Sequence, residues 1–488
     1  AMNGLAQLGG PVACVGLALL IVLRQRRERI AALAVAAVGT GLLGVAVAPD
    51  RPLVVAGGVC AALGLGVGLA GLFRAVPWLY PLLALACVPV RIGVHVGGAS
   101  SKLLLPLYVV ILGATILFGW QLVEGDTRAR ELRLASWPLA AFVGWTGVSL
   151  AWTKDVPEGA VELLAFIIPF TLLALTVARL PWSRLGVRLL TIELTAMALV
   201  FAIVGFYQYQ TRDIFQNPKV IYSNAYAPFF RVNSVFWDPS VYGRFLVLAM
   251  APLVVFVALG RSLRLTAAAG VALVVMWFGL LISYSQSSFA ALTVVVVGAA
   301  FIAWRWRALV AVVLAVAVLA GISVAQPQVR RSLQHHTAHG LNNATSDRSS
   351  LVANGIRIAA HHPVIGVGIG GFKRAYADRV GLKGKDPKKA ASHTTPVTVA
   401  AETGFVGLAL FAWLVAALLL QAFRRRGETL PLVSGLALLA IFCHALFYNA
   451  FFEDPMTWGL MGLTALSLPA FAPARESARA APREAVPV

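Results

Sequence analysis

The stretch from Gly4 to Ala48, GLAQLGGPVACVGLALLIVLRQRRERIAALAVAAVGTGLLGVAVA, decides the fold. It holds two apolar runs, 4–23 and 30–48, each about as long as an α-helix must be to cross a bilayer. The basic turn between them, 24–29, has to stay out of the hydrocarbon because charge is costly there. The first run lacks a small-residue cleavage site and many apolar runs follow it, so we expect a retained helix and not a removable signal peptide.

Composition extends this interpretation to the whole chain. Of 488 residues, 59% are hydrophobic and only 12% are charged, and the mean hydropathy is +0.82. Such values exclude an ordinary soluble domain. The four cysteines all fall in apolar runs without paired metal-ligand spacing, which argues against a disulfide framework and a zinc site. The sequence therefore predicts an all-α, polytopic integral membrane protein.

Candidate spans recur along the chain, and we count fifteen of them. The count falls to thirteen if the short run 76–90 is not a span and the region 265–304 is divided differently. The candidates lie near 4–23, 30–48, 52–72, 76–90, 103–123, 134–152, 161–178, 187–209, 240–259, 265–283, 288–304, 308–326, 396–421, 430–448 and 456–472.

Arginines set the orientation of these spans. The basic turns fall on one side of the predicted bundle, which the positive-inside rule makes cytoplasmic. They are 24–29, 74, 128–133, 179–188, 261–264, 305–307 and 424–426. The same alternation places outside the segments 49–51, 91–102, 153–160, 210–239, 284–287, 327–395 and 449–455.

Hydropathy also divides the chain into five parts. We expect N-terminal transmembrane helices, then central helices with an outer arginine segment and a serine-rich knot, a long outer loop, C-terminal transmembrane helices and a disordered cytoplasmic tail. Their boundaries are 1–230, 231–326, 327–395, 396–472 and 473–488.

The outer loop 327–395 carries an unusual charge. It holds eleven lysines and arginines against three aspartates, and six of the eight histidines of the protein. Most of the net charge of +20 is explained by a basic inner face that meets anionic membrane lipids. The loop opposes that bias, so we expect it to bind an anion. Nucleic acid is a poor candidate because no interleaved aromatic stacking pattern accompanies the basic residues, and the histidines are too irregularly spaced to predict a metal site.

Three outer segments carry the candidate functional residues. In the first, Arg231 follows two phenylalanines, Asp238 suits a helix cap, and Arg244 lies one turn into a span, where it needs a substrate or a protein partner such as Asp238 or a carbonyl. The second is the polar knot 283–288, which serves either helix packing or substrate hydrogen bonding.

The third segment begins as a short interfacial helix near 346–360 that ends before Pro363. The glycine-rich run 366–371 follows it. That run lacks the βαβ context of a dinucleotide fingerprint, so its glycines let backbone amides approach a phosphate or let the chain turn sharply. His393 then precedes the next span, and Glu402 lies about two turns into that span.

In this order the residues resemble the O-antigen ligase and polymerase family. The resemblance covers 231–458 and rests on five segments: Arg231 to Leu246, the knot 283–288, Arg348 to Phe372, His393 to Gly407, and His444 to Trp458. The first half of the chain matches mainly in hydropathy. Two positions depart from the family pattern: Thr394 stands where asparagine is usual, and the knot has Gln286 or Ser288 where an arginine is common.

The resemblance implies a membrane glycosyltransferase of the GT-C type, inverting and without a metal or other cofactor. Its donor would be a glycan on undecaprenyl diphosphate and its acceptor a glycolipid, polysaccharide or protein, joined at the outer face of the bacterial inner membrane. It further implies that His393 engages the acceptor hydroxyl as general base or orienting group and that Arg231 holds the diphosphate, with Arg244, Arg348 or a loop lysine replacing the missing arginine. The remaining candidate substrate contacts are Asp238, Gln286, Ser288, His362, Gly368, Gly370 and Glu402.

Chemistry alone supports these roles, because arginine stabilises a diphosphate leaving group and histidine can accept a hydroxyl proton. Two alternatives remain open. A repeat-unit polymerase would use the same donor. A lipid or polysaccharide flippase would also have many helices, but it should show repeat symmetry and polar breaks at the bilayer midplane, and we find neither.

Overall fold

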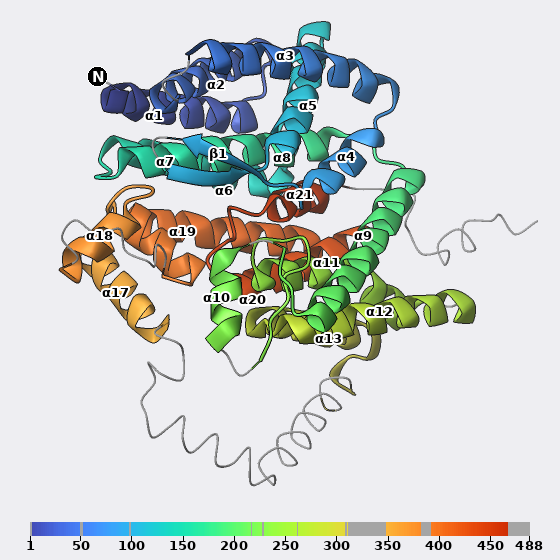
Figure 1. Cartoon of the computed structure of the whole chain (residues 1–488). Coiled ribbons are helices and arrows are strands. Elements are labelled where there is room, and N and C mark those ends of the chain that lie inside the picture. The colour runs from blue at the N-terminus through green and yellow to red at the C-terminus, as the bar shows by residue number, and fades with distance from the viewer. Residues whose placement is uncertain are drawn as a thin grey trace, which may run out of the picture.

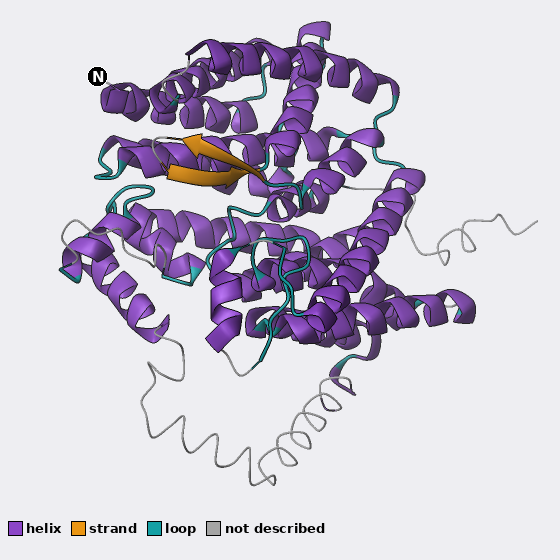
Figure 2. Ribbon diagram, viewed as in Figure 1, coloured by secondary structure: helices purple, strands orange, loops and turns teal. Residues whose placement is uncertain are grey.

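The computed structural model describes residues 2–48, 52–96, 99–215, 217–226, 229–260, 262–307, 310, 348–381 and 392–466. Helices dominate this part of the chain (Figure 2). The sheet present in it is one antiparallel hairpin, in which β1 (Ile92–Val96) pairs with β2 (Ala99–Leu103). The predicted all-α class is confirmed, and the hairpin lies in a segment that we expected only as an outside connection.

Eleven helical segments in the described residues are long and apolar enough to cross a membrane. They correspond to eleven of the fifteen predicted spans, so the polytopic prediction is confirmed. In order they are α1 (Met2–Val22), α2 (Arg26–Val47), α3 (Pro52–Ala75), α5 (Leu105–Glu124), α6 (Ser136–Val148) with its flanking turns η1 (Arg133–Ala135) and η2 (Ser149–Ala151), α7 (Val156–Glu162) continued by the π-helical turn η3 (Leu163–Ile167) and α8 (Ile168–Arg179), α9 (Arg184–Thr211), α11 (Pro239–Leu259), α12 (Leu263–Ser283), α13 (Gln286–Trp304) and α19 (Thr395–Phe423).

The other four predicted spans differ. The run 76–90 contains α4 (Leu79–Cys87), whose nine residues extend only about 13 Å and cannot cross a bilayer. The run 430–448 forms α20 (Thr429–Ala445), an apolar helix of 17 residues, and 456–472 forms the 10-residue α21 (Pro455–Thr464). The run 308–326 except residue 310, the last residues 467–472 of the run 456–472, and the tail 473–488 lie outside the described residues.

The helices stack in layers across the bundle (Figure 1). The pair α1 and α2 packs on α6, α6 packs on α19, and α19 leads through α20 to α11 and α13. Close approach within a layer depends on small residues. A Cβ on Gly39 would lie 2.2 Å from the backbone nitrogen of Ala13, so glycine is needed where α1 and α2 touch. Many large apolar side chains remain exposed, including Leu8, Val38 and Val271, as expected of surfaces that face lipid.

One end of the bundle gathers the basic turns. Arg29 donates to Glu131 at 2.8 Å, Arg179 donates to Asp126 at 2.8 Å and also pairs with Glu131, and Arg128 pairs with Asp126 at 2.5 Å. Turns that are far apart in the sequence therefore meet, as the orientation argument requires of residues on one side of a membrane. Burial raises the pKa of the Asp126 carboxyl, but the hydrogen bonds from Arg128 and the charge of Arg179 outweigh it and leave the pKa below its usual value.

The opposite end carries three short outer helices. They are α10 (Pro218–Tyr226), α17 (Arg348–His361) and α18 (Phe372–Arg379). Figure 1 shows α17 and α18 together beside the end of the bundle where α19 begins. Helix α17 matches the predicted interfacial helix. The rest of the outer loop, 327–347 and 382–391, lies outside the described residues, and with it the loop lysines from Lys383 to Lys389 and the histidines His335, His336 and His339.

Candidate active site

Arg231 lies at the outer end of α12, beside the serine-rich knot. The segment that carries it runs along this helix end, where the Val232 amide donates to the Ile282 carbonyl at 3.2 Å. The Arg231 guanidinium donates through Nε to the Ser283 carbonyl at 3.2 Å, and its half-buried side chain is fixed there. Phe229, two residues earlier, stacks on Tyr284 with ring centroids 4.7 Å apart. An arginine held among aromatic rings at a helix end suits an anion that arrives from the membrane surface.

The serine knot itself is mainly a packing device. Ser285 and Ser288 hydroxyls lie 2.7 Å apart, and Ser288 donates to the Ser240 carbonyl at 3.4 Å. A Cβ on Gly243 would come within 2.6 Å of Ser288 Oγ, so α11 and α13 touch there. Of the two alternatives for the knot, helix packing describes Ser288. Of the two candidate substrate contacts in the knot, Gln286 is exposed and Ser288 is buried.

Arg244 is held by a buried ion pair. Its side chain is 5% exposed, Nε donates to Asp454 Oδ2 at 2.9 Å, and Nη1 donates to the Ala450 carbonyl at 3.2 Å. Asp454 also caps α21, while Asp238 caps α11 by accepting from the Ser240 amide at 2.7 Å. The expected partner of Arg244 was Asp238 or a carbonyl. The structure supplies a carbonyl and an aspartate 210 positions away, and it leaves Asp238 as the helix cap.

Helix α19 is interrupted at Gly404, and the glycine-rich run fills the interruption. Gly404 has φ 71° and ψ −174°, so the helical hydrogen bonds around it are broken. The segment after α17 replaces them: Val367 donates to the Ala401 carbonyl at 2.9 Å and Gly368 to the Glu402 carbonyl at 2.8 Å. On the other side of the break, the Phe405 amide donates to the Pro363 carbonyl at 2.7 Å. The outer loop is thus bonded directly into a membrane helix.

The amides of this run bond to protein acceptors. Ile369 donates to Ser149 Oγ at 3.1 Å, and Phe372 donates to the Glu402 carboxylate at 3.2 Å. A Cβ on Gly368 or Gly370 would lie within 2.5 Å of the backbone of the turn before α7 or of α7 itself. Of the two interpretations given to these glycines, the sharp turn fits this arrangement, and the amides named are not free to cradle a phosphate.

His393 sits in a strained turn immediately before α19. Its φ of 62° is in the left-handed region, which is uncommon for a residue with a side chain. The Ser392 hydroxyl stabilises the turn by hydrogen bonds of 2.7 Å to the Thr394 carbonyl and 2.8 Å to Thr398 Oγ1. The imidazole is half-buried. His362 is exposed at the end of α17, and the side chain of Arg348 lies outside the described residues.

A pocket lies at the start of α19, where Thr395 and Ile369 of the glycine-rich run both line it. It has a cavity volume of about 70 Å³, is partly open to solvent, and lies between α6, α7, α19 and the segment before α21. Its polar lining includes the carboxylates of Glu162, Glu402 and Glu453 and the hydroxyls of Thr146 and Thr395. We predicted Glu402 as a contact but missed the others. Glu162 could have been found from the sequence, because an ionisable residue inside a predicted span indicates a functional site.

The segment before α21 carries two ionisable residues, Glu453 and Tyr448, whose surroundings include charges from other segments of the site. Part of Glu453 is exposed, but the protein around its carboxyl displaces water from it. This desolvation raises the pKa of the carboxyl, and the charges of Arg91 and Arg244 oppose the rise. Tyr448 is affected similarly: desolvation and the charge of Asp238 raise the pKa of its phenol. The first outer segment and the last one therefore lie close enough for their charges to interact.

These contacts place the candidate residues at one end of the bundle. Arg231 touches the end of α12, the knot joins α12 to α13 and α11, Arg244 of α11 reaches Asp454, and the neighbours of Asp454 share the pocket with Thr395, two residues after His393. The structure brings the motif segments together in this order, although it leaves the role of each residue a prediction.

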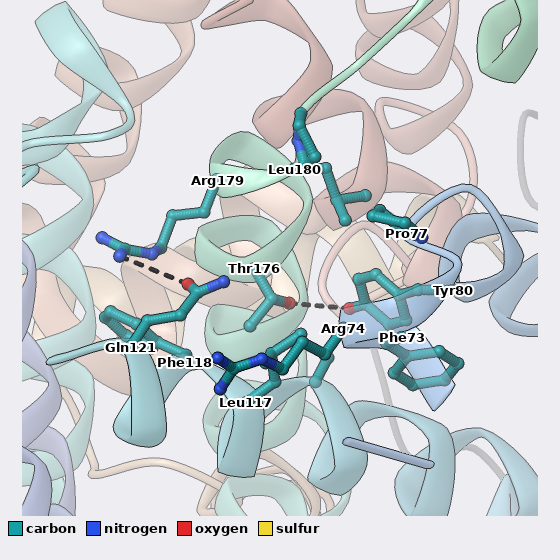
Figure 3. Close-up of a pocket in the computed structure, with 12 residues that line it drawn as sticks. Phe73, Arg74, Pro77, Tyr80, Leu117, Phe118, Gln121, Thr176, Arg179 and Leu180 are labelled. Atoms are coloured by element: carbon teal, nitrogen blue, oxygen red, sulfur yellow. Dashed lines mark hydrogen bonds between the residues drawn. The ribbon is translucent and has the colours of Figure 1, made fainter. Parts of the chain in front are cut away.

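A second pocket lies at the basic end. It has a cavity volume of about 170 Å³ and is lined by Arg74 and Arg179 with aromatic residues. In Figure 3 Arg179 reaches Gln121, and the Tyr80 hydroxyl lies 2.7 Å from that of Thr176. Arg179 is already paired with Asp126 and Glu131, so this pocket offers little unbalanced charge. We therefore place the candidate site at the other end.

Comparison with known proteins supports the family suggested by the motifs. The sequence profile described as O-antigen ligase matches residues 271–412, a range that includes the knot, α17, the glycine-rich run, His393 and Glu402. A comparison with curated proteins gives no match. The family is that of ligase- or polymerase-type glycosyltransferases with lipid-linked glycan and acceptor substrates. Residues 271–412 of this membrane protein match the sequence profile of the O-antigen ligase family.

Proposed function

We propose that the protein transfers a glycan from an undecaprenyl-diphosphate carrier to an acceptor hydroxyl at the outer face of the bacterial inner membrane. The observation that carries the proposal is the placement of Arg231 and His393 at the same end of a membrane bundle whose residues 271–412 match the O-antigen ligase profile. Orientation follows from the arginine turns at the opposite end, which the positive-inside rule assigns to the cytoplasm.

In the proposed reaction the acceptor hydroxyl attacks the anomeric carbon of the donor glycan. The new glycosidic bond forms as the bond from that carbon to the diphosphate oxygen breaks, which inverts the configuration and releases undecaprenyl diphosphate. His393 accepts the hydroxyl proton, and Arg231 stabilises the charge that develops on the leaving diphosphate. If arginine neutralises the charge that develops on the diphosphate, the reaction needs no metal ion for that purpose.

Arg244 takes a different part. Because Asp454 and the Ala450 carbonyl hold its guanidinium, we assign it to positioning of the segment before α21 and not to the diphosphate. Arg348 and the loop lysines remain candidates for a second phosphate contact. Glu402 accepts hydrogen bonds from the Phe372 amide and the Gly370 amide, so its carboxylate is held against the glycine-rich run.

The acceptor decides between ligase and polymerase. A ligase would join the glycan to a glycolipid, polysaccharide or protein, whereas a polymerase would join it to another carrier-linked repeat. Purified protein in detergent is incubated with lipid-linked donor from the host strain and with each acceptor class, and products are separated by mass. We expect a product that grows with time and releases undecaprenyl diphosphate in equal amount. Carrier-linked glycan crossing the bilayer of a vesicle without any new glycosidic bond would instead establish the flippase alternative.

A further inference from the structure

The pocket at the start of α19 contains two buried hydroxyl groups without a partner. Thr146 is 2% exposed and Thr395 is 1% exposed, and Oγ1 of each makes no hydrogen bond. Both residues line the pocket. An unsatisfied buried hydroxyl destabilises a protein, and such groups are rare enough to need an explanation.

Other threonines of this chain avoid the problem. A threonine within a helix can donate to the carbonyl four residues earlier, as Thr171 and Thr403 do at 2.6 and 2.7 Å. Thr146 lies inside α6 and does not do so. Thr395 is the first residue of α19 and has no helical carbonyl behind it. The two hydroxyls therefore keep unused hydrogen-bonding capacity on residues of the pocket wall.

Three carboxylates share this pocket. Glu162, Glu402 and Glu453 lie near enough for their charges to interact. They are not gathered tightly enough to bind a cation, because no group of three carboxylate, histidine or cysteine side chains in the described residues could hold a metal. Buried carboxyl groups that lie this close share protons, so they can both donate to and accept from the hydroxyls of a neutral ligand, and the negative charge that they keep disfavours an anionic ligand.

We propose that this pocket binds an uncharged saccharide unit, whose hydroxyls donate to Glu162, Glu402 and Glu453 and accept from Thr146 and Thr395. On this assignment the pocket is the sugar subsite of the transferase, and the assignment rests on the proposed function. The saccharide comes from either the donor glycan or the acceptor, since both bring hydroxyl-bearing rings to the outer end of α19. A sugar that carries a carboxylate is excluded from this subsite.

The first test measures binding without turnover. Ligand-observed NMR on the full-length protein in detergent compares the neutral disaccharide N,N′-diacetylchitobiose with the hyaluronan disaccharide, in which glucuronate replaces one ring. Wild-type protein should bind the neutral sugar at millimolar concentration and the uronate sugar much more weakly. Equal binding of the two, or no binding of the neutral one, overturns the inference.

Isosteric variants locate the binding. Thr395→Val and Thr146→Val remove only the unpartnered hydroxyl, so each should weaken binding by about tenfold, the effect of one lost hydrogen bond. Neither should unfold the protein, because valine removes a polar group that was unsatisfied. The matched control is Thr457→Val, whose hydroxyl is equally buried and unpartnered but does not line the pocket. Loss of binding in the control as well, or in none of the three, contradicts the assignment.

Turnover separates this inference from the proposed function. In the transfer assay Thr395→Val should raise KM for one substrate by about tenfold with little change in kcat. A rise for the acceptor assigns the pocket to the acceptor sugar, and a rise for the lipid-linked donor assigns it to the donor sugar. If neither KM changes while the wild type transfers glycan, the subsite is wrong and the transferase stands. If saccharide binds as predicted but no glycan is transferred, the transferase is wrong and the subsite stands.

Discussion

Replacing Gly404 by alanine should detach the outer loop from α19. A Cβ at this position would lie 2.1 Å from the Val364 carbonyl oxygen and 2.6 Å from the Ile365 nitrogen, which are backbone atoms that cannot rotate away. The backbone at φ 71° and ψ −174° is also a conformation that only glycine adopts readily. The loop and the helix must therefore separate for alanine to fit.

The energetic cost follows from these contacts. Forcing alanine into this conformation costs on the order of 1–3 kcal/mol. Separation also weakens the hydrogen bonds from Val367 to Ala401 and from Phe405 to Pro363, at about 1 kcal/mol each. We expect a total of about 3–5 kcal/mol, which raises the population of the locally open form by at least about a hundredfold.

Hydrogen exchange measured by mass spectrometry reports this opening directly. Peptides that cover 363–372 and 399–407 should exchange about a hundredfold faster in Gly404→Ala, and glycan transfer should fall with them because the pocket loses one wall. The matched control is Gly270→Ala, in the middle of α12 with no atom within 4 Å of the added Cβ, where exchange should not change. Protection in Gly404→Ala within about twofold of the control would refute the reasoning.

Four further predictions test the site and its orientation. Arg231→Ala should raise KM for the lipid-linked donor by tenfold or more, roughly the loss of one hydrogen bond to a charged group, and Arg231→Lys should recover only part because the planar fork is lost; unchanged KM in both rejects the assignment. His393→Ala should lower kcat by about a hundredfold with donor KM largely kept, activity should fall on acidification as the imidazole protonates, and a chelator should have no effect; near-wild-type turnover would move the base elsewhere. Asp454→Asn should destabilise the protein by about 3–5 kcal/mol in thermal or denaturant unfolding, because a buried arginine loses its counter-charge; a stability equal to wild type would show that this pair is not needed. In a chain without its native cysteines, Arg374→Cys should react with an impermeant thiol reagent in intact spheroplasts and Arg184→Cys only after permeabilisation, since both positions are exposed at opposite ends; the reverse pattern would invert the topology.

Hydropathy was sufficient for most of the fold. A run of about twenty apolar residues has few ways to satisfy its backbone in lipid other than as a helix, so eleven spans could be predicted within a few residues. The length of the short helix α4 was overestimated, because hydropathy shows where apolar residues lie and not where the helix ends. The hairpin of β1 and β2 was missed although Gly97 and Gly98, which separate the two strands in the sequence, are a typical hairpin-turn pair, because the segment was interpreted only as a connection between two spans.

The site was harder to predict, because its contacts join residues that are distant in the sequence. Motif order predicted Arg231, His393 and Glu402 as site residues, and the structure places all three at the same end of the bundle, while their roles stay predictions. Nothing in the sequence near Arg244 indicates that its partner is Asp454. The glycine-rich run was interpreted as either a phosphate cradle or a sharp turn, and only the neighbouring acceptors on α19 and Ser149 show where its amides are used.

The interruption of α19 connects the glycine-rich run, the pocket and His393, which lie in different segments of the chain. A continuous helix would satisfy its own carbonyls and give the outer loop nothing to bond. The interruption at Gly404 exposes the carbonyls of Ala401 and Glu402 just inside the outer end of the helix, and the glycine-rich run occupies them. That bonding fixes the Glu402 carboxylate toward the Phe372 amide and the pocket, only nine residues from His393. The same break therefore anchors α17 and α18, shapes the pocket and sets the entrance to α19 where His393 stands. A substitution that restores a regular helix at Gly404 should accordingly impair the site even though it touches no proposed substrate contact.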